Sequence, residues 1–389
     1  MQDSIAFAKL LQSTLLHEYA ISPPARVNDN TYFSIFFTLE SIYPCKYTDY
    51  LLTLTPMKSI LGIGNALTDI LAILPDDSLL REFHLPKGSM QHIDMDTGDK
   101  IWARIKDLDV HYVAGGSAAN TITCTSIFGM PSYYIGKIGD DEIGHLYQSD
   151  EEQYGVKCTL LRGKNSTGKS IVFVSGANAE RTFAVCLGAA LELVPEDLKP
   201  EYFQGKDYFH IEGYLVQNQD VVRTAVKMAR DAGCIISLDL ASYNVVESNE
   251  AFLHDIVEKY VDIVFANESE SRAFTHQRDP RKALDEIARY CDIAVVKIGK
   301  AGSWVKGGGQ AFFIGSWPGE AIDATGAGDT YAAGFLYAHS LGMPLEVCGK
   351  VGSIIAAKVV EVIGSKIDIP RWKEAKEEIR ALLAEYTNN

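Results

Sequence analysis

Short apolar runs alternate with longer amphipathic segments along the chain from Met57 onward. The runs are rich in β-branched and aromatic residues, as buried strands are, and the segments between them repeat apolar positions with the period of a helix. This alternation indicates an α/β fold whose mainly parallel sheet is covered by helices on both faces. The predicted strands are residues 59–63, 133–135, 208–211, 235–238, 263–265 and 294–297, and the predicted helices are residues 117–128, 220–232, 250–261, 280–291 and 371–386.

Two segments interrupt this alternation. Residues 71–112 are rich in turn and polar residues, whereas residues 156–187 contain β-type runs in succession, at 156–162, 171–174 and 182–187. Consecutive strands without intervening helices form antiparallel hairpins. We therefore expect parts of both segments to form a small β-sheet lid on the larger α/β body. Lids of this kind exclude water and complete a site when they close.

Residues 1–56 differ from the rest of the chain. Their most apolar stretch, TYFSIFFTLESIYP, is interrupted by Glu40 and Pro44 and is too short for a membrane span. The first residues lack the basic stretch of a secretory signal. We expect residues 1–56 to be an appendage, such as an over-extended gene start, and residues 57–389 to form the functional domain.

The overall charge and the cysteines narrow the function classes. A net charge of −15 over 389 residues argues against general binding to nucleic acid or to anionic membranes, since either needs a basic surface. The seven cysteines are scattered, odd in number and without a C-x-x-C pair. We therefore expect reduced thiols, no zinc site and a cytoplasmic protein.

Residues 163–170 read GKNSTGKS, which fits the phosphate-binding P-loop pattern G-x-x-x-x-G-K-[ST]. That pattern binds phosphate only between a strand and a helix, where backbone N–H groups and the helix dipole face the ligand. Here the strand-like run 171–174 follows, so we interpret the octapeptide as a turn between two lid strands. The alternative is a P-loop NTPase that uses Lys169, with Asp239 as the carboxylate after a second strand.

The sequence DATGAGD, residues 323–329, precedes a helix with small residues on one face that ends at Gly342. A Gly-Ala-Gly turn at a helix N-terminus offers N–H groups to the negative charge of a transferring phosphoryl group. Asp329 falls in the first helical turn, where an ionised carboxylate suited to general-base catalysis is favoured. The alternative is a glycine-rich turn in which the aspartate only caps a helix.

Two further glycine motifs lie upstream. AGGSAAN, residues 114–120, enters a helix; its paired glycines let a ligand approach the backbone, and Asn120 can offer a donor and an acceptor to a diol. GIGNALTD, residues 62–69, begins like a dinucleotide fingerprint, but Leu67 stands where the third glycine belongs. A Rossmann oxidoreductase is therefore a weak alternative.

The three motifs, in this order and at these intervals, resemble those of the ribokinase family of PfkB-type sugar and nucleoside kinases. The resemblance covers almost all of residues 57–370. NESE, residues 267–270, resembles the family's N-x-x-E motif for Mg²⁺ and phosphate, and VKIGKAG, residues 296–302, resembles a strand and loop beside the nucleotide. The family implies a ribokinase-like α/β fold with a lid, ATP as phosphoryl donor, and Mg²⁺.

The resemblance also implies roles for single residues. Asp329 would deprotonate the acceptor hydroxyl. Lys297 departs from the hydroxyl residue that is usual at its position. The implied sets are an anion hole of Gly326, Ala327 and Gly328; acceptor contacts from Asp69, Gly115, Gly116, Asn120 and Glu212, with Arg181 near phosphate; nucleotide contacts from Lys297, Gly299, Gly302 and Ser353; Mg²⁺ held through water by Asn267 and Glu270; and K⁺ near Asp323 and Thr325.

The motif style is closest to adenosine kinase-like members, because ribokinases typically follow the glycine pair with Lys-Gly-Ala-Asn. Ala119, however, occupies a position where eukaryotic adenosine kinases often have Gln. Adenosine is the expected acceptor, and a ribokinase- or fructokinase-type sugar kinase is the second candidate. A non-catalytic ligand-binding protein of the same fold is a third. Family members include both monomers and dimers joined through their lids, so a homodimer stays open.

Overall fold

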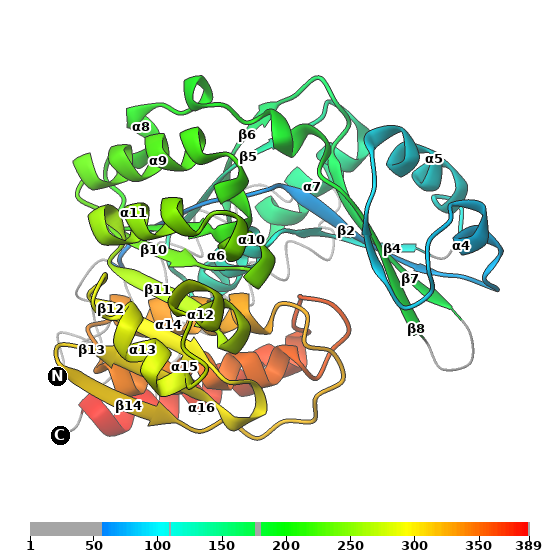
Figure 1. Ribbon diagram of the computed structural model, residues 1–389. Coiled ribbons are helices and arrows are strands. Elements are labelled where there is room, and N and C mark those ends of the chain that lie inside the picture. Colours follow the sequence, from blue (N-terminus) through cyan, green and yellow to red (C-terminus); the bar gives the residue numbers. More distant parts are fainter. Residues whose placement is uncertain (1–56, 109, 176–179, 388–389) are drawn as a thin grey trace, which may run out of the picture. The chain divides into compact units, whose positions relative to one another are not determined.

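The computed structural model describes residues 57–108, 110–175 and 180–387 (Figure 1). The expected appendage, residues 1–56, lies outside the described residues. Within the described part, no helix is both long and apolar enough to cross a membrane.

The body of the fold is a sheet in which nine strands of the described part pair in the order β14-β13-β12-β11-β10-β9-β1-β5-β6. The strands from β12 to β6 in this order, which are β12, β11, β10, β9, β1, β5 and β6, run parallel. Strands β13 and β14 are antiparallel to their neighbours. The six predicted strands all lie in this sheet and are confirmed. The bounds are β1 Ile60–Ile63, β5 Ser132–Ile138, β6 Lys157–Arg162, β9 Tyr208–Glu212, β10 Ile235–Asp239, β11 Ile263–Asn267, β12 Ile293–Lys297, β13 Ser303–Gly307 and β14 Gln310–Ile314.

Helices cover both faces of this sheet (Figure 1). Successive strand residues point to opposite faces, so Phe265 packs in one core with Phe335, while its neighbour Val264 packs in the other with Leu253. Truncating a buried phenylalanine such as Phe335 to alanine would cost about 3–5 kcal/mol. The first core holds α6 Ser117–Ile127, α14 Ala327–Ser340, α15 Leu345–Val359 and α16 Ile369–Thr387; the second holds α9 Gln219–Asp231, α11 Glu250–Tyr260, α12 Glu268–Thr275 and α13 Pro280–Ile287.

A second, smaller sheet forms the lid, with the strand order β3-β8-β7-β2-β4. On one of its faces Ile70 and Phe173 pack against Ile101 and Ile143 of two flanking helices. Strands β7 and β8 form the expected antiparallel hairpin. The bounds are β2 Leu67–Ile73, β3 Met90–His92, β4 Val110–Gly115, β7 Gly168–Ser175 and β8 Glu180–Cys186, with helices α4 Ser78–Glu82, α5 Met95–Ile105 and α7 Glu142–Gln153 beside them.

One expected lid strand lies elsewhere. The run 156–162 contains β6, which pairs in parallel with β5 at the edge of the large sheet, so its assignment to the lid is wrong. The reason is helix α7: a helix between two strands makes a crossover, which brings them side by side in parallel. The octapeptide 163–170 therefore links the large sheet to the lid.

Candidate active site

A cavity of about 820 Å³ lies where the lid meets the large sheet. Its walls come from the carboxyl ends of β9 to β12, from the first turns of α6 and α14, from α15, and from lid strands β2, β7 and β8. The crevice at the carboxyl ends of parallel strands is where open α/β sheets bind ligands. Five carboxylates and two lysines stand among its lining residues, so the wall carries net negative charge.

The register of the parallel strands determines which polar side chains lie next to one another on this wall. Glu212 at the end of β9 is paired with Asp239 at the end of β10. Asn267 at the end of β11 is paired with Lys297 at the end of β12. Because neighbouring parallel strands end at the same edge, residues far apart in sequence meet there.

Asp329 stands in the first turn of α14 and is held by two donors on α6. The Ser117 hydroxyl donates to its Oδ1 at 2.7 Å, and the Asn120 amide donates to its Oδ2 at 2.9 Å. Burial raises the pKa of Asp329 to about 6, although these two hydrogen bonds act in the opposite direction. The result is a positioned carboxylate that is ionised at neutral pH and more basic than an exposed aspartate.

The glycine turn before Asp329 has the conformation that an anion hole needs. Gly326 has a φ of 74°, and a Cβ there would lie 2.8 Å from Cβ of Ser365. The first-turn N–H groups of a helix have no acceptors within the helix. Gly326, Ala327 and Gly328 line the cavity, so the N-terminal end of α14 faces it. This end can accept negative charge.

Asp69 on lid strand β2 lines the cavity from the lid. Burial raises its pKa to about 6, while hydrogen bonding from Ser170 and the charge of Lys366 oppose that rise. Gly115 on the neighbouring strand β4, where it pairs with Leu67, is required by this packing, since a Cβ there would lie 2.3 Å from Oδ2 of Asp69. Gly115 makes room for the carboxylate, whereas Gly116 lines the cavity itself.

Glu212 lies on the cavity wall with its carboxylate already engaged. Its Oε1 accepts from the backbone N–H and the side-chain amide of Asn65, both at 2.8 Å, and its Oε2 accepts from the backbone N–H of Ala118 at 2.9 Å. Burial raises the pKa of Glu212 to about 7. Glu212 therefore links the segment after β1, through Asn65, to the start of α6, through Ala118. A direct contact of Glu212 with the acceptor stays a prediction.

Asn267 and Glu270 form a capping box at the start of α12. The Glu270 N–H donates to Oδ1 of Asn267 at 2.9 Å, and the Asn267 N–H donates to Oε2 of Glu270 at 2.7 Å. Burial, reinforced by Asp239, raises the pKa of Glu270. In the described ranges no three His, Cys, Asp or Glu side chains form a metal cage. The donor set fits Mg²⁺ held through water and nucleotide phosphates, as this cation commonly is.

Four residues were expected at the nucleotide, and all four line the cavity: Lys297, Gly299, Gly302 and Ser353. The Ser353 hydroxyl accepts from the Trp317 N–H at 2.8 Å and donates to the carbonyl of Gly315 at 3.2 Å, so it fixes the loop after β14. On the same helix, α15, Ala356 and Ala357 add apolar side chains to the cavity wall.

Asp323 and Thr325, the residues expected near K⁺, are hydrogen-bonded to each other. Both carboxylate oxygens of Asp323 accept hydrogen bonds, from the Thr325 hydroxyl at 2.8 Å and from the Gly364 N–H at 2.8 Å. These bonds staple the turn before Gly326, and the potassium site stays a prediction. The backbone of Arg181 pairs in β8 opposite Val174, but its side chain lies outside what the structure describes.

The octapeptide does not form a P-loop, because strand β7 follows it instead of a helix. The Lys169 ammonium donates to Asp99 of α5 at 2.7 Å and to the carbonyl of Thr167 at 3.1 Å. Lys169 is 1% exposed and does not line the cavity, whereas the next residue, Ser170, does. The octapeptide thus contributes its last residue, Ser170, to the cavity lining.

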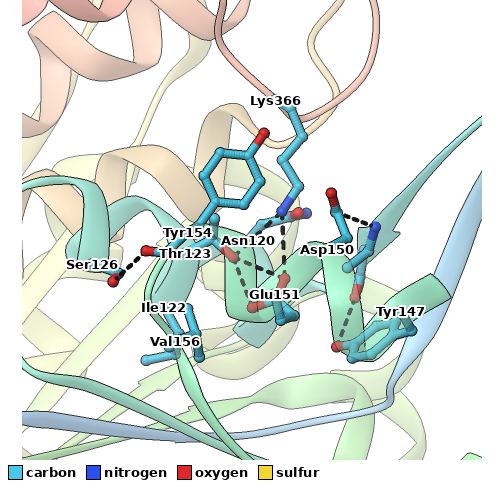
Figure 2. A network of polar contacts seen from close by, with 12 residues as sticks. Asn120, Ile122, Thr123, Ser126, Tyr147, Asp150, Glu151, Tyr154, Val156 and Lys366 are labelled. Carbon is cyan, nitrogen blue, oxygen red and sulfur yellow. Dashed lines mark hydrogen bonds and ion pairs between the residues drawn. The ribbon is translucent and has the colours of Figure 1, made fainter. Parts of the chain in front are cut away.

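A buried polar network contacts the end of β4 and helix α6, which flank Gly116 (Figure 2). From α7, Asp150 accepts from the Ala114 N–H at 2.7 Å, and Glu151 accepts from the Thr123 hydroxyl of α6 at 2.9 Å. Lys366, from the loop before α16, reaches Thr123 at 3.3 Å and Glu151 at 3.5 Å. The network connects α6 to α7 and to the loop before α16. Helix α6 is also the helix whose Ser117 and Asn120 hydrogen-bond Asp329.

Ser117, Ser170 and Asp239 are among the cavity residues that were not assigned there from sequence. Ser117 lies inside AGGSAAN, where a hydroxyl at a helix start is a usable signal. Ser170 was placed where the octapeptide runs into the next lid strand and was given no role, and Asp239 was considered only for a P-loop enzyme. Both become recognisable only when strand pairing places them, opposite Asp69 and Glu212 respectively.

Comparisons with known proteins agree with this geometry. The pfkB family carbohydrate kinase profile matches residues 101–372. The chain belongs to this family. The adenosine kinase from Sinorhizobium meliloti is 32% identical, with a TM-score of 0.73 over 83% of this chain and 100% of that one. A probable sugar kinase from Rhizobium etli is 29% identical, with a TM-score of 0.73 over 83% of this chain and 99% of that one.

A curated relative adds a sugar-type acceptor. The 5-dehydro-2-deoxygluconokinase of Halalkalibacterium halodurans is 26% identical over 319 residues, which are 78% of this chain and 95% of the relative. The protein is therefore a PfkB-family phosphotransferase that acts on a sugar or a nucleoside, and ATP use follows from the family.

Proposed function

We propose that the protein transfers the γ-phosphoryl group of ATP to a hydroxymethyl group of a nucleoside, with adenosine as the leading acceptor. The observation that carries the proposal is the position of Asp329. Its carboxylate is fixed by Ser117 and Asn120 at the N-terminal end of α14, in a cavity that Asp69 also lines. A base, an anion-binding helix end and a hydroxyl-binding carboxylate thus share one cavity.

The proposed reaction needs positioning and charge stabilisation more than covalent help. Asp69 and Asn120 orient the acceptor hydroxyls. Asp329 takes the hydroxyl proton while the acceptor oxygen forms its bond to the γ-phosphorus. The bond from that phosphorus to the β–γ bridging oxygen breaks, and ADP leaves. The backbone around Gly328 stabilises the charge on the transferring group.

Mg²⁺ enters the proposal as the partner of ATP. Glu270 and Asn267 would hold it through water, and when bound it neutralises phosphate charge. The wall's excess of carboxylates makes this neutralisation necessary, since ATP is itself an anion.

Two observations support a nucleoside acceptor. The adenosine kinase of Sinorhizobium meliloti matches over its whole length at 32% identity. The lid side of the cavity also presents an apolar wall from Leu67, Val185 and Leu187, and Tyr214 is among the lining residues. A nucleobase would cover such a wall, whereas a free sugar would leave it in water. The relatives that act on sugars keep a sugar acceptor as the second candidate.

The test is a panel of nucleosides and sugars assayed for ADP release with Mg-ATP. We expect adenosine to have a kcat/KM at least ten times that of any free pentose or hexose. A higher kcat/KM for ribose, fructose or 5-dehydro-2-deoxygluconate would replace the nucleoside proposal with the sugar one. No turnover on any hydroxyl acceptor would favour a ligand-binding protein instead.

A further inference from the structure

Lys297 and Asp239 form an ion pair on the cavity wall. The Lys297 ammonium lies 2.7 Å from Oδ2 of Asp239, with the two side chains 15% and 7% exposed. Both residues end their strands, β12 and β10. The family resemblance places Lys297 near the nucleotide but gives it no part in the transfer step.

The ammonium of Lys297 also touches the anion hole. A Cβ built on Gly328 would lie 3.0 Å from Nζ of Lys297. Because Gly328 has no side chain, the ammonium can approach the backbone of the first turn of α14. The positive end of that helix and the lysine ammonium thus lie beside the same backbone position, Gly328.

The Lys297 ammonium is already largely removed from water. Its side chain is 15% exposed, and the ammonium donates a hydrogen bond to Asp239 at 2.7 Å. A second anion beside Lys297, such as a phosphoryl oxygen, would therefore find a cation that needs little further desolvation.

Asp239 can lose the lysine without losing its place. Its other oxygen, Oδ1, accepts from the Ala241 N–H at 2.8 Å, which anchors the carboxylate at the strand end. The lysine ammonium sits on a flexible four-carbon stem, so a small rotation carries it between neighbouring acceptors. The pair thus consists of a fixed anion and a movable cation.

We propose that Lys297 is a further catalytic residue, whose ammonium leaves Asp239 to bind an oxygen of the transferring phosphoryl group over Gly328. The inference rests on the proposed phosphoryl transfer and assigns the cation at its anion hole. Lys297 keeps its proton throughout the step. The acceptor proton goes to Asp329, the new O–P bond forms, the bond to the bridging oxygen breaks, and the lysine offsets the charge that develops.

A purely structural role is the competing explanation: Lys297 would only neutralise Asp239. The two roles separate in the double variant Lys297→Met with Asp239→Asn. If the lysine only neutralises its partner, removing both charges together should restore activity, since neutral replacements of buried ion pairs are often tolerated. If it stabilises the phosphoryl group, the double variant stays slow.

The experiment compares wild type, Lys297→Met, Lys297→Arg and the double variant for kcat and KM. It also compares their affinity for ADP alone with that for ADP plus tetrafluoroaluminate, which mimics the transferring group. We expect Lys297→Met to lower kcat about 10²–10³-fold, as loss of one anion-hole group does. ADP affinity should change by less than about threefold, the tighter binding of the mimic should be lost, and arginine should restore part of kcat.

The control is Lys306→Met, which breaks a similar lysine–aspartate pair, 2.6 Å to Asp285, on β13 away from the cavity. We expect its kcat to match wild type. A Lys297→Met enzyme with wild-type kcat, or a double variant that regains it, would overturn the inference while leaving the proposed function intact. A wild type that transfers to no acceptor would instead overturn both. If Lys297→Met does not fold, the double variant decides.

Discussion

Asn120 and Asp329, more than two hundred positions apart in the chain, are joined by a 2.9 Å hydrogen bond from the amide to Oδ2. The bond connects the first turns of α6 and α14. Within the described part of the chain, Oδ1 of Asn120 has no hydrogen-bond partner, so a reversal of the amide would break the bond to Asp329 and leave no bond of Oδ1 to replace. The base of the proposed reaction is therefore held by a side chain that can adapt to it.

The first prediction concerns Asp329→Asn. Removing the base should lower kcat about 10²–10⁴-fold. Binding of ATP and acceptor should persist, because Asn120 can reverse its amide to accept from the new side chain. Steady-state kinetics together with calorimetric titration of both ligands would check this. An Asp329→Asn enzyme with more than a tenth of wild-type kcat would exclude Asp329 as the general base.

The same variant should be more stable than wild type above pH 6. The carboxyl pKa is about 6 in the fold against 3.8 as its ordinary value, so its stabilising contribution is complete below 3.8 and is lost as pH rises through 6. The ionised group then costs up to about 3 kcal/mol. Urea unfolding at pH 4 and pH 8 should show a gain only at pH 8. An equal gain at both would contradict the linkage.

The third prediction is the pH dependence of kcat/KM. Activity should rise with pH through about 6, because Asp329 must be ionised to accept a proton. Asn120→Ala removes a donor to the ionised form and should move this limb upward by about one pH unit. Initial rates between pH 4.5 and pH 8.5 would measure both. A limb that stays in place in Asn120→Ala would mean that another group titrates.

The fourth prediction concerns Lys169 and Ser170, the last two residues of the octapeptide, to which the structure gives different surroundings. Lys169→Met breaks a buried bond to Asp99 and should cost about 1–3 kcal/mol of stability, with the KM for ATP unchanged. Ser170→Ala should raise the KM for the acceptor several-fold, since Ser170 hydrogen-bonds Asp69. The exposed pair of Lys100 and Asp96 supplies the control, and Lys100→Met should change neither quantity. A loss of ATP binding in Lys169→Met would restore the P-loop interpretation.

The parts that sequence alone predicted are those written in contiguous residues. DATGAGD contains its own turn, helix start and carboxylate, so Asp329 and the glycines before it were identified together. The alternation of strands and helices likewise predicted the parallel sheet. The expectation for 156–162 failed because the apolar run was grouped with the strands after it, whereas helix α7 before it decides its pairing.

The contacts that sequence did not predict depend on the sideways pairing of strands. Nothing near Asp239 in the chain shows that Lys297 will reach it, because two strand pairings intervene. The direction of Lys169 is set in the same way, by the burial of one face of β7 against α5. Pattern matching found that lysine in a perfect P-loop string, and packing turned it toward Asp99.

Only residues 64–66 separate β1, in the large sheet, from β2, in the lid. Asp69 lies on β2 of the lid, whereas Asp329 lies on α14 of the body. An acceptor bound by both residues would connect the lid to the body. Such a ligand should restrain the lid more than ATP does alone. Amide hydrogen exchange in β2 and β7 should slow when the acceptor binds, and the lid would then report the identity of the correct acceptor without any chemical turnover.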